Sequence, residues 1–167
     1  MKLDEFCAKL NARLAELTST DERLHTTVQA LAKAFRVSHD EVALLVLQSN
    51  NPNMLCFLWP QKLGKAGCIP LSAHNALAAK TVRGNRSFIN NQFAAEPHAV
   101  IFEQVRLDTV PQQPIQKIIS VPLIHDSKAN GAIQISRKGA DEKSVADFVQ
   151  NDVKVLEEIA RVLAGYF

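Results

Sequence analysis

The sequence predicts an α+β fold in which helices from both ends of the chain pack on one face of an antiparallel sheet. Apolar residues alternate through residues 115–139 on either side of a polar break, which is typical of a long β-hairpin in the middle of a sheet. Apolar residues at helical spacing occur in residues 1–36 and again in residues 144–167. Because strands and helices do not alternate regularly between these ends, we do not expect a doubly wound parallel sheet.

Length and composition are those of an ordinary globular domain. The 167 residues, of which 47% are hydrophobic and 22% charged, suffice for one domain with a substantial core. The 19 basic and 17 acidic residues nearly balance, and no basic run suggests a nucleic-acid partner. The N-terminus lacks the pattern of a signal peptide, and no apolar run approaches the ~20 residues that span a bilayer. We therefore expect one domain over residues 1–167, in the cytoplasm, without a membrane or nucleic-acid partner.

Two amphipathic helices are predicted within residues 1–36. Thr18-Ser19-Thr20 separates them, and Ser19 with Glu22 fits a capping box, which is typical of a helix start. The second helix is expected to end near Arg36. The apolar positions at helical spacing are Leu3, Phe6, Cys7, Leu10, Leu14 and Leu17 in the first helix, and Leu24, Val28, Leu31, Ala32 and Phe35 in the second.

Residues 41–139 are predicted to hold the sheet and the segment that covers its second face. Glu41–Gln48 is apolar on both sides, as in a central strand, and Met54–Trp59 returns beside it as the other half of a hairpin. Cys68–Leu71 is expected at an edge, because Pro70 lacks an amide donor for the sheet.

A helix over Ala73–Arg83 is predicted next, with Ser72 as its N-cap and Gly84 at its C-terminus. Ser87–Asn90 has the pattern of a short strand. Residues 91–107 are expected to be irregular at first and helical in their second half. Residues 73–107 would then cover the sheet face that the terminal helices leave open.

The hairpin of residues 115–139 is predicted to turn within His125–Gly131, where Asn130-Gly131 supplies positive φ angles. The last helix, from about residue 144 to residue 167, carries more apolar surface than one sheet face requires. We expect it to pack against the N-terminal helices or against a second subunit.

The order of these elements resembles that of the GAF domain family. The resemblance extends over nearly the whole chain and depends on IPLS before the predicted helix, on SFINN, on KIISVPLIHDSKANGAIQISRKG, and on FVQNDVKVLEEIARVLAGYF at the end. It implies a six-stranded antiparallel sheet related to that of PAS domains, with a pocket between the sheet and residues 73–107. It also implies dimerisation through the terminal helices and a sensory role. It names no ligand or cofactor, because the sequence shows neither an NKFDE-type signature nor a counterpart of the chromophore-attaching cysteine.

Large apolar and polar side chains come together in and near residues 88–103, as a small-molecule site requires. His98 is the group in that segment that titrates near neutral pH. The alternative is that the aromatic residues are core and the polar residues belong to a solvated loop. The candidate ligand-binding residues are Trp59, Phe88, Asn90, Phe93, His98, Phe102 and Glu103.

Neither the cysteines nor the histidines indicate a metal site. Cys7, Cys56 and Cys68 stand singly and without a CxxC pair, so we expect buried, reduced thiols. The five histidines are scattered, and no pair has the spacing of metal ligands on one helix.

The sequence therefore favours a small-molecule-binding sensory domain that signals through its terminal helices and is not an enzyme. One alternative is the family's free methionine sulfoxide reductase activity, with Cys68 as a reactive cysteine. That cycle needs a resolving thiol, and neither residues 72–79 nor residues 87–102 contain one. The other alternative is an interaction module whose pocket is filled by its own side chains.

Overall fold

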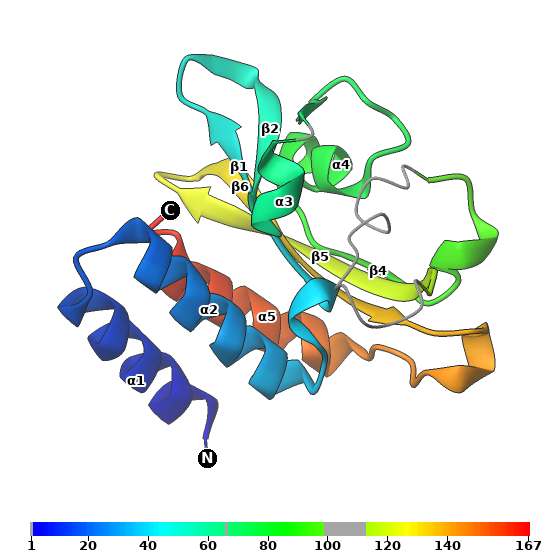
Figure 1. Cartoon of the computed structure of the whole chain (residues 1–167), viewed down its shortest axis with the longest axis horizontal. Helices are drawn as coiled ribbons and strands as arrows, with labels where there is room; N and C mark the ends of the chain where they lie inside the picture. Colours follow the sequence, from blue (N-terminus) through cyan, green and yellow to red (C-terminus); the bar gives the residue numbers. More distant parts are fainter. Residues whose placement is uncertain (1, 66, 99–112) are drawn as a thin grey trace.

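One antiparallel sheet lies at the centre of the computed structural model, which describes residues 2–65, 67–98 and 113–167 (Figure 1). Within these residues the sheet has six strands in the order β3-β2-β1-β6-β5-β4, and each neighbouring pair is antiparallel. The α+β prediction is therefore confirmed. The strands are β1 (Val42–Gln48), β2 (Asn51–Trp59), β3 (Cys68–Pro70), β4 (Phe88–Asn90), β5 (Ile115–His125) and β6 (Lys128–Lys138).

Helices cover both faces of this sheet, as Figure 1 shows. The N-terminal helices α1 (Leu3–Glu16) and α2 (Thr20–Phe35) lie on one face together with the C-terminal helix α5 (Gln150–Leu163). The short helices α3 (Gln61–Gly64) and α4 (Leu77–Gly84) lie on the other. No helix of the described ranges has both the length and the apolar character that crossing a membrane requires. The 3₁₀ turns are η1 (His39–Glu41), η2 (Phe93–Ala95) and η4 (Glu142–Ser144).

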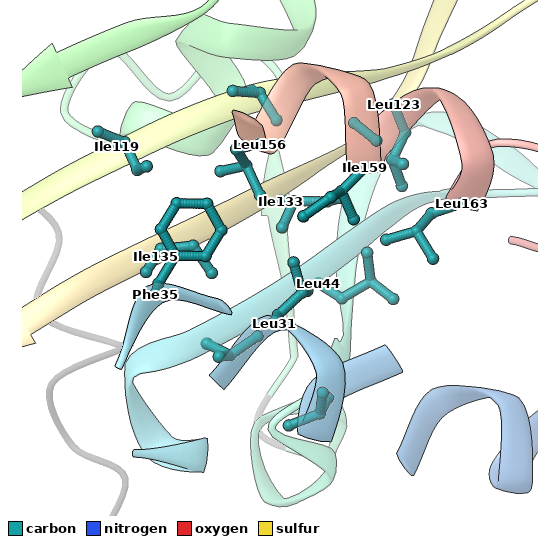
Figure 2. Packing of buried hydrophobic residues seen from close by; sticks show 14 of the residues in the cluster. Leu31, Phe35, Leu44, Ile119, Leu123, Ile133, Ile135, Leu156, Ile159 and Leu163 are labelled. Atoms are coloured by element: carbon teal, nitrogen blue, oxygen red, sulfur yellow. The ribbon is translucent and has the colours of Figure 1, made fainter. Parts of the chain in front are cut away.

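The larger core lies between the sheet and helices α2 and α5, with α1 packed outside them (Figure 2). Alternate residues of the strands supply its floor, because successive side chains in a strand point to opposite faces. Complete burial of each such side chain stabilises the fold by about 1.5–3 kcal/mol. The residues labelled in Figure 2 are Leu31 and Phe35 from α2, Leu44 from β1, Ile119 and Leu123 from β5, Ile133 and Ile135 from β6, and Leu156, Ile159 and Leu163 from α5.

The turn of the β5–β6 hairpin differs from the prediction. It consists of Asp126 and Ser127, whose φ angles of 48° and 65° are both positive, and not of Asn130 and Gly131. Gly131 instead lies within β6, where a Cβ atom would come 2.3 Å from the carbonyl oxygen of Leu45 in β1. Glycine is required there for the close approach of two strands and not for a turn.

Two helices begin later than the sequence predicts. Helix α4 starts at Leu77 and not at Ala73, and residues 71–76 form an irregular segment. Asn85, with a φ of 46°, takes the left-handed C-cap position that we expected of Gly84. Helix α5 starts at Gln150, where the Asp152 carboxylate accepts a hydrogen bond from Val149 N at 2.8 Å. A carboxylate at the third helical position that accepts from the N-cap N–H is typical of a helix start.

The expectation of reduced thiols is wrong for two of the three cysteines. Cys56 of β2 and Cys68 of β3 form a disulfide, with a Cα–Cα distance of 4.3 Å. The two residues are opposite each other in the antiparallel register, although they are 12 positions apart in the sequence. Cys7 is a free thiol. The cytoplasmic location remains a prediction.

We predict that replacing both Cys56 and Cys68 with serine lowers the free energy of unfolding by about 3 kcal/mol. The disulfide closes a short loop and so lowers the entropy of the unfolded chain. For a loop of this length, that effect stabilises the folded state by about 3 kcal/mol. Urea unfolding followed by circular dichroism measures the change. Cys7→Ser is the control and should leave stability within about 0.5 kcal/mol of the parent. An equal effect of the control would contradict the structural role of the cross-link.

We also predict that Gly131→Ala is destabilising by about 1–3 kcal/mol, because the new methyl group overlaps the Leu45 carbonyl oxygen. Gly165→Ala is the matched control, since its nearest heavy atom would be 3.9 Å away. Thermal unfolding of both variants tests the prediction. Equal melting temperatures would show that the β1–β6 spacing relaxes freely.

Candidate functional site

A cavity of about 520 Å³ opens on the α4 side of the sheet. Three segments line it: the approach to α4 and its first turn (residues 74–80), strand β4 with the following loop (residues 88–93), and residues 96–98. Apolar side chains such as Leu77 and Phe93 alternate there with polar ones such as Asn75 and Gln92. This mixture of apolar wall and converging polar groups is typical of small-molecule sites.

The inner wall of the cavity is Phe93, whose side chain is buried. Behind it a residual space of about 30 Å³ reaches the sheet, where Phe57, Ile118 and Gln134 line it. Asn75 and Leu77 line both spaces together with Phe93. Side chains therefore occupy most of the volume against the sheet, and the larger space lies toward the α4–β4 side.

His98 and Phe93 form a pair in the wall of the cavity. Their rings lie 4.0 Å apart, centroid to centroid, at an interplanar angle of 32°. His98 Nδ1 lies 2.7 Å from the carbonyl oxygen of Glu96, which makes Nδ1 the donor. In the neutral ring Nε2 is then an acceptor.

Asn90 stabilises the loop that carries this pair. Its Nδ2 donates to the Glu96 carboxylate at 2.9 Å, and its Oδ1 accepts from Gln92 N at 2.8 Å. The second contact is an Asx turn, which holds the backbone directly after β4. The amide therefore serves the shape of the cavity wall, and Glu96 receives one polar partner.

Asn91, next along the chain, connects the cavity to the terminal helix. Its Nδ2 donates to the Phe148 carbonyl oxygen and its Oδ1 accepts from Phe148 N, both at 2.9 Å. Phe148 is only 2% exposed and lies just before α5. The Asn91 side chain therefore pairs with both backbone groups of Phe148, as a neighbouring strand would, although Phe148 lies outside the sheet.

Two cationic side chains also contact the segment before α5. Lys117 of β5 has a side chain that is 5% exposed, and its Nζ donates to the Asp147 carboxylate. Arg137 of β6 donates to the carbonyl oxygens of Ala146 and Asp147 at 2.9 and 2.7 Å. Its guanidinium carbon lies 4.0 Å from the centroid of the Phe148 ring. The segment before α5 is therefore connected by side chains to the turn after β4, to β5 and to β6.

Helix α4 is connected to the sheet by a buried polar contact. Thr81 Oγ1 and Ser120 Oγ lie 2.7 Å apart, and Gln134 Nε2 donates to Ser120 Oγ at 3.2 Å. Thr81 and Ser120 are fully buried. These hydrogen bonds fix α4 at one position on the sheet, because a shift of the helix would break the contact between the buried hydroxyl groups of Thr81 and Ser120.

Four of the seven candidate ligand-binding residues come together at the cavity, namely Phe88, Asn90, Phe93 and His98. Phe102 and Glu103 lie outside the described residues. The placement of Trp59 in this wall is wrong. Its ring packs against the core under the terminal helices, 5.3 Å from the His25 ring, and its Nε1 donates to the His39 carbonyl oxygen at 2.8 Å.

The sequence analysis did not identify the residues that reach the cavity from the α4 side. His74, Asn75 and Lys80 line it, but we had placed them all in one helix from Ala73. The run Ser-Ala-His-Asn before the helix was the available signal, since such residues also favour irregular segments. No group of three His, Cys, Asp or Glu side chains in the described part of the chain has the geometry of a metal site.

Comparison with known proteins identifies the fold. The family model described as GAF domain matches residues 19–166. The GAF domain from an Acinetobacter phosphoenolpyruvate-protein phosphotransferase superposes with a TM-score of 0.73 at 14% identity, over 99% of this chain and 94% of that chain. Free methionine-R-sulfoxide reductase from Neisseria meningitidis, solved with its substrate, superposes with a TM-score of 0.68 at 17% identity, over 99% and 87%. No curated protein matches the chain.

We predict that Asn91→Ala lowers the free energy of unfolding by about 1–3 kcal/mol. The substitution leaves the backbone N–H and C=O of a buried residue, Phe148, without their partners. Asn90→Ala is the matched control, because Asn90 bonds only within its own exposed loop. Urea unfolding of the two variants compares them. A cost for Asn90→Ala equal to that of Asn91→Ala would refute the link to α5.

Proposed function

Because this chain belongs to the GAF domain family, we propose that it is a sensory domain that binds a small molecule between α4 and the loop after β4. One observation carries the proposal: Asn91 lines the cavity and bonds to the backbone immediately before α5. A ligand that moves the cavity wall therefore also acts on a terminal helix. Neither a cofactor nor a catalytic residue is part of this proposal.

The signal follows the contacts of Asn91. A ligand that replaces water against Phe93 and His98 changes the preferred position of the loop in which Asn91 lies. Because Asn91 bonds to Phe148 in both directions, a shift of the loop moves the start of α5 or breaks these bonds. A ligand that prefers one of these arrangements shifts the population toward it.

The layer of terminal helices receives the signal in this proposal. Helix α5 contacts β5 on the sheet and α1 on its outer side. We propose that a second copy of the chain docks on these helices, so that the change at α5 is transmitted across a homodimer. The amphipathic character of α1, of which Leu10 and Leu14 are buried, supports the packing of this layer.

The geometry of the cysteines supports a sensor over the reductase. Cys56 supplies the second thiol that the sequence analysis did not find near Cys68. However, their neighbours Leu55, Phe57 and Ile69 face the core beneath α4. Because side chains alternate along a strand, the disulfide lies on the sheet face opposite the cavity. A sulfur in that position does not reach a substrate bound beside Phe93.

The free cysteine is also a poor nucleophile. Burial raises the pKa of the Cys7 thiol, and the nearby carboxylates Glu158 and Asp4 raise it further. The thiolate, which is the reactive form, is therefore less populated at neutral pH than in an ordinary cysteine. Cys7 lies on α1, in the layer across the sheet from the cavity.

Thermal-shift measurements with amino acids, organic acids, nucleotides and cyclic nucleotides test the proposal. A ligand at one hundred times its dissociation constant stabilises the folded state by about 2.7 kcal/mol. For a domain of this size that corresponds to a rise in Tm of about 5–10 °C. We predict that His98→Ala weakens such a ligand about tenfold. His25→Ala, which alters a histidine on the opposite sheet face, should leave the affinity unchanged.

Hydrogen exchange of α5 in the presence of the same ligand tests the coupling. Protection of residues 150–163 should change in the parent protein and stay constant in Asn91→Ala. If no compound raises the Tm, or if the two histidine variants weaken binding equally, the sensor proposal fails. The chain would then be better described as an interaction module with a cavity of no function.

A further inference from the structure

We propose that the ligand of this cavity carries a phosphate group, which binds to the cations Lys80, Arg83 and Arg86 around Phe88. The inference rests on the proposed function and specifies its ligand as a phosphorylated small molecule. A second hollow of about 360 Å³ is lined by these four residues and Gly84. Lys80 and Phe88 also line the main cavity, so the two spaces adjoin.

The three cations converge through the local geometry of α4. Lys80 and Arg83 are three positions apart, which places them on the same side of the helix. The left-handed Asn85 then reverses the chain, and the Arg86 side chain lies over Gly84, 3.4 Å from the position of a Cβ atom there. Residues before and after the helix end therefore face the same hollow.

The Phe88 ring contacts two of the cations. Lys80 Nζ lies 4.8 Å from the ring centroid and the Arg86 guanidinium carbon lies 4.9 Å from it. Each cation–π contact favours a position of the charge beside the ring. Arg83 donates from Nη1 to the carbonyl oxygens of Leu71 and Ala73. Its Nε and Nη2 donors make no hydrogen bond to a described residue.

No carboxylate of the described residues forms an ion pair with any of the three cations, although Lys9, Arg13, Lys117 and Arg161 each have such a partner. Two nearby carboxylates accept hydrogen bonds from other residues. Glu96, in the main cavity, accepts from Asn90. Glu157, which lines the next hollow with Arg86, accepts from Ser87 Oγ at 2.5 Å.

A purely structural role explains the cluster less well. The carboxyl end of a helix attracts cations, and Arg83 occupies such a position in α4. Lys80, however, lies in the middle of the helix and Arg86 lies beyond its end. A phosphate would neutralise the three charges at once, and guanidinium groups suit it through charge-assisted, paired hydrogen bonds. Because the cations are exposed, we expect the phosphate alone to bind weakly, in the millimolar range.

Titration with phenyl phosphate, followed by NMR of the arginine Nε–H groups and the His98 ring, tests the inference. In the parent protein the signals of Arg83 and Arg86 should shift with the same dissociation constant as those of His98. The double variant Lys80→Gln/Arg86→Gln should weaken binding at least tenfold. Lys9→Gln/Arg13→Gln removes the same net charge from α1 and should bind as the parent does.

Three outcomes would overturn the inference: arginine signals that do not move, equal weakening in both double variants, or a phosphoserine peptide that binds more tightly than phenyl phosphate. The outcomes for the proposed function can be distinguished from these. If an uncharged compound binds in a His98-dependent way while phosphate leaves the arginines unaffected, the sensor stands without a phosphate site. If phenyl phosphate moves the arginine signals but not those of His98, the phosphate binds apart from the cavity, and the inference about the cavity's ligand fails.

Discussion

The pairing of β5 with β6 is the interaction on which the rest of the structure depends. These two strands carry apolar residues on both faces, so neither face tolerates water. Ile133 and Ile135 pack under the layer of α2 and α5, whereas Ala132 and Ile118 pack under α4 and its flanking segments. A sheet of this kind is stable only between two covering layers, and the cavity lies at the margin of the thinner one.

The thinner layer is positioned by polar contacts. Thr81, Ser120 and Gln134 fix α4 on the sheet, and Asn90 shapes the loop after β4. Hydrogen bonds have directional requirements that apolar contacts lack, so they hold the cavity walls at defined positions without filling the space between them. In the sensory role that we propose, a wall held in this way would respond to a ligand as a unit.

In the mechanism that we propose, a change at the cavity reaches the terminal helices around the end of the sheet and not through it. Asn91, Lys117 and Arg137 all contact the segment that precedes α5. The central strands are packed on both faces and have little freedom to move. The segment before α5 is held by side chains from outside the helix, and it is there that we propose the coupling between the cavity and the helices.

The sequence by itself determined the fold class and most of the elements, because burial patterns of period two and 3.6 are local properties. It also grouped Phe88, Asn90, Phe93 and His98, which are close together along the chain and line one cavity in the structure. Only the tertiary structure decided which distant residues meet. It paired Cys56 with Cys68, put Trp59 under the terminal helices, and brought His74 and Lys80 to the cavity. The pairing of distant strand residues depends on contacts between segments, and a local pattern marks the start of a helix only to within a few residues.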